Sequence, residues 1–291
     1  MTKLFTGCAT ALVTPFKGYE IDYESVDKLI QMQLENEVDA LVICATTGES
    51  TALSTYEKNI LLSYVIQKVD GKCKVIFGIS SSSTKSAAEL AEDAEDIGAD
   101  ALLISAPPYT KPSQEGIYLH YKEISSRVNI PVIIYNVPSR AGVNIEPETV
   151  LRLSKISNIL GLKEASTDIA HIIKVFSLVS KDFCIYSGND NLTYTFLTLG
   201  GKGVISVLSN ILPFEVKTMC QAYFSGNIER AKKLQFEYLN LVNALFIESN
   251  PVPIKEAMAE LSYISSDVRL PLTNLSEENK LILLENLRSV L

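Results

Sequence analysis

A lysine in the middle of an apolar segment is the first residue whose type and position suggest chemistry. Lys163 lies within residues 159–165 (ILGLKEA), a run typical of a buried strand. Burial disfavours the charged ammonium, so a lysine in this setting is predicted to act as an amine nucleophile that forms a Schiff base with a ketone. The alternative is a structural lysine whose ammonium extends to the strand end or pairs with Glu164.

Two residues in and after the preceding apolar segment suit the same chemistry. Tyr135 lies in the run 131–137, and side-chain alternation predicts that Tyr135 and Lys163 project into one cavity. A phenol beside such an amine is a candidate proton donor and acceptor, although a tyrosine with a purely structural role would give the same pattern. Arg140 is a candidate clamp for a carboxylate or, alternatively, an ordinary surface arginine.

Hydroxyl groups and glycines follow other apolar segments. Thr46 and Thr47 precede a glycine turn that leads into a helix, where free N–H groups and hydroxyls suit a small carboxylate; helix capping is the alternative. Tyr109 lies in a proline-rich loop that fixes its direction, as part of a site or as an interface anchor. Gly188 ends another segment, at a position where a backbone can approach a ligand closely.

Eight short apolar segments position these residues, and most of them precede a helical pattern. Continuous runs of Val, Ile and Leu that alternate with amphipathic helices indicate a parallel sheet covered by helices. Eight such units in about 220 residues predict a (β/α)8 TIM barrel, whose site forms at the carboxyl ends of its strands. A doubly wound open sheet is the alternative. The segments span residues 8–14, 39–45, 74–80, 101–106, 131–137, 159–165, 183–188 and 203–208.

Helical patterns divide the chain into two parts. Capping residues and periodicity predict helices over residues 23–35, 55–69, 84–96 and 146–154. Beyond residue 211 the strand pattern stops, and helices are expected over 214–224, 228–246, 253–261 and 276–291. We therefore predict a barrel domain over residues 1–224 and a C-terminal helical domain over residues 225–291.

Composition excludes several classes of function. A formal net charge of -8 with no basic run argues against nucleic acid or an anionic membrane as a partner. The 5 cysteines show no CxxC spacing, which favours free thiols in a reducing cytoplasm. With 2 histidines far apart, neither a metal site nor a Ser-His-Asp centre is expected. No segment suggests a membrane span, a signal peptide or a nucleotide-binding loop.

Taken in order, these motifs resemble the dihydrodipicolinate synthase family over nearly the whole chain. The resemblance implies a class I aldolase-type condensation of pyruvate with L-aspartate 4-semialdehyde, the first committed step of the diaminopimelate route to lysine, without a metal or organic cofactor. It is carried by TTGES at 46–50, the tyrosine at 109 before PSQEG at 112–116, YNVPSR at 135–140, GLKEA at 161–165, GVIS at 203–206 and NPVP at 250–253.

The resemblance also implies roles for the catalytic candidates. Lys163 forms the imine with pyruvate, and Tyr135 donates and accepts protons. A relay through Thr46 links Tyr135 to Tyr109, which a neighbouring subunit lends to the site. The family is typically a tetramer built as a dimer of dimers, and this arrangement lets a tyrosine cross between subunits.

The remaining candidates are implied to bind substrate. Thr47 and nearby amides hold the pyruvate carboxylate, and Gly188 and Ile205 line the pocket through their backbones. Arg140 meets the carboxylate of the aldehyde. The rival family is N-acetylneuraminate lyase, which shares the lysine and tyrosine but generally lacks this arginine. A barrel that binds a keto acid without catalysis is the alternative from another class.

Regulation by lysine is not expected. In regulated relatives, a histidine pair, an asparagine, a glutamate and a tyrosine hold the inhibitor in a subunit-interface cleft. The motif alignment places Thr55, Lys58, Ser82, Ser86 and Pro108 at those positions. Loss of the glutamate removes an acceptor for the inhibitor's ammonium groups, and Lys58 adds a like charge.

Overall fold

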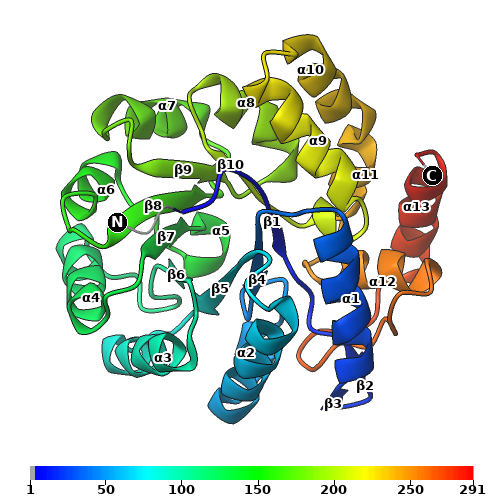
Figure 1. Ribbon diagram of the computed structural model, residues 1–291, viewed down its shortest axis with the longest axis horizontal. Helices are drawn as coiled ribbons and strands as arrows, with labels where there is room; N and C mark the ends of the chain where they lie inside the picture. Colours follow the sequence, from blue (N-terminus) through cyan, green and yellow to red (C-terminus); the bar gives the residue numbers. More distant parts are fainter. Residues whose placement is uncertain (1–3, 291) are drawn as a thin grey trace.

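The computed structural model describes residues 4–290, and within them eight parallel strands close into a barrel (Figure 1). Each strand pairs with its neighbours in chain order, and the last strand pairs with the first. The predicted (β/α)8 barrel is confirmed, and the open sheet is wrong. The strands are β1 (Gly7–Ala11), β4 (Ala40–Ile43), β5 (Lys74–Ile79), β6 (Ala101–Ser105), β7 (Val132–Asn136), β8 (Ile159–Glu164), β9 (Cys184–Ser187) and β10 (Gly203–Ser206).

Helices form a ring around this barrel, with C-terminal helices at one side (Figure 1). Those of the barrel are α1 (Tyr23–Glu35), α2 (Thr55–Val69), α3 (Thr84–Ile97), α4 (Gln114–Arg127), α5 (Pro138–Ala141), α6 (Pro147–Leu153), α7 (Ile169–Leu178), α8 (Thr193–Thr198) and α9 (Pro213–Phe224). The C-terminal ones are α10 (Ile228–Glu237), α11 (Leu239–Ala244), α12 (Val252–Glu260) and α13 (Glu277–Arg288). Single 3₁₀ turns are η1 (Ser50–Ala52), η2 (Asp190–Leu192) and η3 (Leu208–Asn210).

Local sequence signals explain where several helices begin. Ser54 caps α2 through a reciprocal capping box: its hydroxyl accepts from the Glu57 N–H, while the Glu57 carboxylate accepts from the Ser54 N–H. Asp22 caps α1 and Ser83 caps α3 through a side-chain oxygen that accepts a backbone N–H, without the reciprocal bond of a capping box. Gly98 ends α3 with a φ of 107°, a conformation that glycine adopts without a steric penalty.

Two parts of the structure differ from the expectation. A short hairpin of β2 (Phe16–Lys17) and β3 (Glu20–Ile21) follows β1, and the apolar pattern gives no sign of it. The helix predicted over residues 228–246 is wrong as a single element, because it breaks at Tyr238. The first half packs against α9 and the second against α13. Of the helix predicted over 276–291, Leu291 lies outside the described residues.

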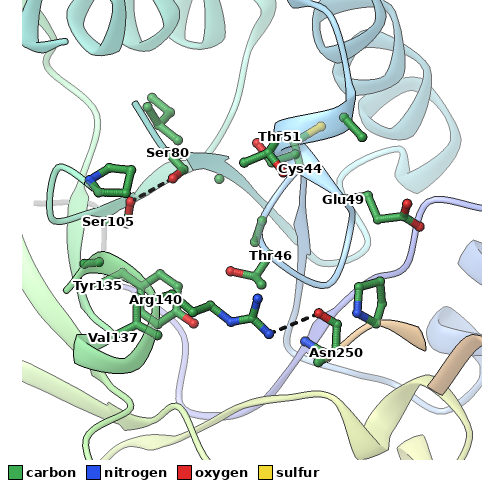
Figure 2. A pocket seen from close by; sticks show the side chains of 18 of the residues that line it. Cys44, Thr46, Glu49, Thr51, Ser80, Ser105, Tyr135, Val137, Arg140 and Asn250 are labelled. Atoms are coloured by element: carbon green, nitrogen blue, oxygen red, sulfur yellow. Dashed lines mark hydrogen bonds between the residues drawn. The ribbon is translucent and has the colours of Figure 1, made fainter. Parts of the chain in front are cut away.

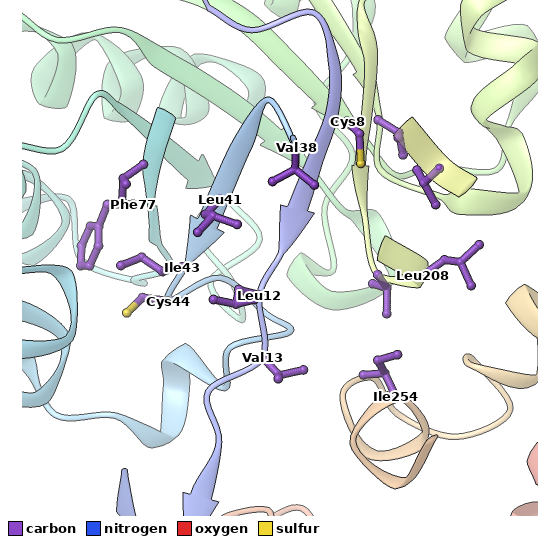
Figure 3. Close-up of a cluster of buried hydrophobic side chains, with 14 of the residues drawn as sticks. Cys8, Leu12, Val13, Val38, Leu41, Ile43, Cys44, Phe77, Leu208 and Ile254 are labelled. Carbon is purple, nitrogen blue, oxygen red and sulfur yellow. The ribbon is translucent and has the colours of Figure 1, made fainter. Parts of the chain in front are cut away.

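The apolar core has two layers. The barrel interior is filled mainly by small and branched side chains, with Phe5 stacked on Tyr186 at a centroid distance of 4.2 Å. A larger layer lies between the strands and the outer helices, where Leu41 and Phe77 pack (Figure 3). Ile254 of α12 belongs to this layer, so a C-terminal helix contributes to the barrel's own core (Figure 3).

The C-terminal helices continue from the barrel without a separate core. Helix α10 packs on α9, α11 packs on α13, and α12 contacts η3 beyond β10. The domain boundary near residue 224 therefore stays a prediction, and residues 1–3 and 291 of the two proposed domains lie outside the described part of the chain. Among residues 4–290, none of the helices combines the length and hydropathy that crossing a membrane requires.

Candidate active site

A cavity of about 240 Å³ lies at the carboxyl ends of the strands, where the barrel fold predicts a site (Figure 2). Its wall is built by the loops after β4, β5, β6 and β7 together with two C-terminal segments. Thr46, Tyr135 and Arg140 face this space (Figure 2). The lining residues come from segments 44–52, 78–80, 103–108, 135–141, 249–251 and 269–272.

Tyr135 and Lys163 lie side by side on adjacent strands. They are register partners of β7 and β8, and Lys163 also pairs in register with Tyr186, whose ring fills the barrel interior. Lys163 is 4% exposed, and its Nζ lies 4.5 Å from the centre of the Tyr135 ring. The lysine side chain therefore projects inward, beside a tyrosine that lines the cavity. Strand alternation predicts this arrangement.

Lys163 does not pair with the adjacent Glu164. The Glu164 carboxylate faces the opposite side of β8, where it accepts hydrogen bonds from Asn136 Nδ2 and from the Ser166 N–H. Within residues 4–290, Lys163 takes part in no salt bridge. The sequence alternative of a structural ion pair with Glu164 is therefore wrong, and the amine is held in the barrel interior with no carboxylate at salt-bridge distance among residues 4–290.

Asn250 joins two of the predicted substrate-binding residues. Its Nδ2 donates to Thr47 Oγ1 at 3.0 Å, and its carbonyl oxygen accepts from Arg140 Nη2 at 3.1 Å (Figure 2). Since the Thr47 hydroxyl accepts from Asn250, its own proton remains free to be donated to a ligand. Asn250 lines the cavity, and its Oδ1 has no partner among the described residues.

Five of the predicted site residues are not among those that line this cavity: Lys163, which lies beside Tyr135, Tyr109, and three others. Thr47 is buried just behind it, and Ile205 is buried in the barrel interior with Tyr135. Gly188 has a packing reason for its identity, because a Cβ there would lie 2.7 Å from the Ala165 Cβ. Their contact with substrate stays a prediction.

Tyr109 does not reach the cavity of its own chain. Its side chain is 92% exposed, and its φ of 71° fixes the loop in an uncommon conformation. A large aromatic side chain in such a position is available to a second protein surface. The relay that the family resemblance implies requires a neighbouring subunit and is not formed within one chain.

Several polar residues that line the cavity are not predicted as site residues from the sequence. Ser105 donates to Ser80 Oγ at 3.2 Å on the wall opposite Asn250 (Figure 2). Glu49 and Arg269 lie on the wall near Thr46. Asn250 appears in the NPVP motif, yet nothing in its local pattern indicates a partner about 200 residues away. Among residues 4–290, no three His, Cys, Asp or Glu side chains gather as metal ligands would.

A buried polar network lies behind the two strands that carry Tyr135 and Lys163. Asn136 Nδ2 also donates to Asn144 Oδ1, and Asn136 Oδ1 accepts from the Ile145 N–H. His171 Nε2 lies 3.4 Å from Glu164 Oε2. The Glu164 carboxylate raises the pKa of His171 above its ordinary value, while burial acts in the opposite direction. This network fixes the carboxyl ends of β7 and β8 relative to α7.

The fold and the cavity define a class: a (β/α)8 barrel with a buried amine beside a phenol at the carboxyl end of its strands. The chain belongs to the Dihydrodipicolinate synthetase family, whose model matches residues 4–289. This match confirms the resemblance that the sequence motifs indicate.

Individual relatives agree with this membership over nearly their whole length. The chain is 42% identical to the 4-hydroxy-tetrahydrodipicolinate synthase of Alkaliphilus oremlandii, covering 98% of both chains. The crystal structure of dihydrodipicolinate synthase from Thermotoga maritima matches with a TM-score of 0.97 at 43% identity, covering 98% of both chains. The chloride-inhibited dihydrodipicolinate synthase of Acinetobacter baumannii, complexed with pyruvate, matches with a TM-score of 0.96 at 36% identity, covering 99% of each chain.

The two histidines should affect stability with opposite pH dependence. A raised pKa in the folded state means that the contribution of His171 is complete below about pH 6.5, the unfolded value, and is lost as pH rises through the folded pKa. We expect His171→Gln to cost on the order of 1 kcal/mol near pH 5.5 and less near pH 8.5, measured by urea unfolding.

His120 provides the matched control. Burial lowers the pKa of His120 to about 4, so the folded state resists its protonation and loses stability as pH falls below the unfolded value. The cost of His120→Gln should therefore grow as pH rises. The same pH trend for both variants would contradict the assigned environments.

Proposed function

We propose that this chain is a 4-hydroxy-tetrahydrodipicolinate synthase, which condenses pyruvate with L-aspartate 4-semialdehyde on the route to diaminopimelate and lysine. Family membership over residues 4–289 supports the activity. The observation that carries the mechanism is the Lys163 amine, 4% exposed and 4.5 Å from the Tyr135 ring, at the cavity end of the barrel. No metal or organic cofactor is needed for the steps proposed below.

The proposed reaction begins with attack of Lys163 Nζ on the keto carbon of pyruvate. Water leaves, and a protonated imine remains, which draws electrons from the neighbouring C–H bond. A methyl proton departs, the resulting enamine carbon attacks the aldehyde carbon of the second substrate, and the alkoxide formed takes up a proton. The amino group of the second substrate then attacks the imine carbon, which closes the ring and releases the Lys163 amine. Tyr135 is the proposed proton donor and acceptor in these steps, because its phenol lines the cavity beside the amine.

We assign recognition of the two substrate carboxylates to Thr47 and Arg140, which Asn250 connects. Thr47, whose hydroxyl proton is free to donate, is proposed to hold the pyruvate carboxylate together with nearby amides, while Gly188 and Ile205 line the pocket through their backbones. Arg140 stands at the rim, with one nitrogen bonded to Asn250 and the rest of its guanidinium available for the carboxylate of the aldehyde. This arginine favours the synthase over an N-acetylneuraminate lyase.

The assembly proposed for this enzyme is a tetramer built as a dimer of dimers in the cytoplasm. The exposed Tyr109 would enter the neighbouring subunit's site and complete a relay through Thr46 to Tyr135. The five free cysteines suit a reducing compartment. A barrel that binds a keto acid without catalysis is the alternative, and it would bind pyruvate without turning it over.

Borohydride should trap pyruvate on Lys163. Reduction of an imine gives a stable secondary amine, so peptide mapping by mass spectrometry should place the adduct on Lys163, with loss of activity. Lys255 is the internal control, since it is fully buried but lies in α12. An adduct on Lys255, or none, would sink the Schiff-base mechanism. Lys163→Ala should fold but form no adduct.

Arg140 and Tyr109 should have separable kinetic effects. Arg140→Ala should raise KM for aspartate semialdehyde about tenfold or more with little change for pyruvate, because a clamp on one carboxylate supplies binding energy. Tyr109→Phe should mainly lower kcat, by about 10²-fold, because a relay hydroxyl acts in the chemical steps. Steady-state kinetics with both substrates varied tests this; equal losses for both substrates in both variants would refute separate roles.

L-Lysine should not inhibit this enzyme at sub-millimolar concentration. Lys58 is 9% exposed, and burial lowers its pKa. Its own amine fills this position, so an ammonium group of the inhibitor would find little space there and no opposite charge to bind. Titration of L-lysine into the condensation assay measures this. The variant Lys58→His with Ser86→Glu restores two expected recognition groups and should gain inhibition. Half-inhibition of the wild type below about 1 mM would refute the alignment. The alignment implies that at least one charge-assisted hydrogen bond to the inhibitor is missing, and such a bond is worth about 1.5 kcal/mol or more.

A further inference from the structure

A fully buried ion pair lies next to the cavity and has no role in the proposed mechanism. Lys255 of α12 is 0% exposed, and its Nζ donates to Glu49 Oε1 and to the Asp267 carbonyl oxygen. The same Nζ lies 4.2 Å from the centre of the Phe16 ring. Burial lowers the pKa of Lys255 to about 8, and the Glu49 charge opposes this shift. A buried charge of this kind persists where its partners are fixed.

The second oxygen of Glu49 is bound as well. Glu49 Oε2 accepts from the Arg269 N–H at 2.9 Å. The Arg269 side chain donates to carbonyl oxygens of Tyr19 and Ala52 and to Glu57, and its guanidinium carbon lies 4.4 Å from the Phe16 ring centre. One carboxylate thus joins the cavity loop after β4 to α12 and to the segment around residue 269.

The loop that Glu49 anchors is the one that carries Thr46 and Thr47. The Glu49 N–H donates to the Thr46 carbonyl oxygen at 3.1 Å, and Glu49 has a φ of 51°. A glutamate in the left-handed region is uncommon and persists where surrounding contacts hold it. Its carboxylate points away from the centre of the cavity, where Thr46 and Arg140 lie (Figure 2). Glu49 therefore holds this loop through contacts on the side that faces away from the cavity.

We propose that the Glu49–Lys255 pair is a positioning device that holds the loop of residues 46–52 so that Thr46 and Thr47 meet pyruvate. Neither residue is placed to touch the substrate, since both are bonded within the wall. The inference rests on the proposed function for the identity of the substrate. It assigns to a C-terminal helix a part in catalysis, beyond its contribution to the core.

A second ion pair on the barrel, partly exposed, provides a control at a distance from the cavity. Lys217 of α9 binds Asp39 at 2.9 Å, and Asp39 also accepts from the Cys8 N–H. Asp39 precedes β4, so this pair lies at the amino ends of the strands, away from the cavity. Loss of either pair should lower stability, but only loss of the Glu49–Lys255 pair should change the handling of pyruvate.

The experiment compares Glu49→Gln, Lys255→Met, the double variant and Lys217→Met. Each single variant should lower Tm, because it leaves a charge without its partner, whereas the double variant should regain much of the loss. KM for pyruvate should rise about tenfold or more in Glu49→Gln, in Lys255→Met and also in the double variant, since a misplaced hydroxyl no longer meets the carboxylate. Lys217→Met should lower Tm with KM unchanged.

Two outcomes overturn the positioning role. Either KM recovers together with Tm in the double variant, or the KM values of the cavity-side variants match that of Lys217→Met. If a single variant fails to fold, the Tm and the KM for pyruvate of the double variant test the positioning role. A wild-type chain without condensation activity would refute the proposed function instead; half-saturation of borohydride trapping by pyruvate then replaces KM as the readout.

Discussion

The barrel closes where β1 pairs with β10, and this seam leaves no room for a side chain. A Cβ at Gly203 would lie 1.8 Å from the Gly7 carbonyl oxygen, and both residues have positive φ angles. Closure brings the carboxyl ends of all eight strands to one end of the barrel. Phe5 and Tyr186 fill part of the interior below, so the cavity forms at the end where Tyr135 and Lys163 lie. The chemistry of the site depends on this closure.

Two buried carboxylates near the site are held by hydrogen bonds inside the wall rather than lining the cavity. Glu164 is held by Asn136 and Ser166 on the outer face of β8, and Asp190 accepts from two backbone N–H groups after β10. Burial raises the pKa of Asp190, while these hydrogen bonds act in the opposite direction. Both carboxylates therefore have hydrogen-bond partners within the wall, and neither forms a salt bridge with Lys163 among residues 4–290.

The sequence predicts the barrel well because its signals are local and repeated. Continuous apolar runs mark all eight strands, and caps such as Ser54 fix helix starts to the residue. Alternation along β7 and β8 then predicts that Tyr135 and Lys163 are neighbours, as their register shows. The hairpin at residues 16–21 escapes prediction because its two-residue strands are too short for a periodic pattern.

Long-range partners escape prediction for a different reason. The bonds from Asn250 to Thr47 and from Lys255 to Glu49 each join residues more than 200 positions apart, and no spacing rule connects them. Family resemblance marks the NPVP segment as important but gives Asn250 and Lys255 no task. Such contacts depend on how α12 packs against the finished barrel, which is a tertiary property.

These contacts change how the C-terminal helices are understood. A barrel ending near residue 224 would keep Lys163 and Tyr135, yet it would lack the segments 249–251 and 269–272 that form one wall of the cavity. It would also leave Glu49, with its φ of 51°, buried without Lys255 and without the Arg269 N–H. Since an unpaired buried carboxylate is costly, the loop with the two threonines would be expected to rearrange. The barrel therefore supplies the reactive groups, and the C-terminal region supplies one wall of the cavity, from the segments before and after α12, and the anchor Lys255 of α12, which together hold the carboxylate-binding loop against them.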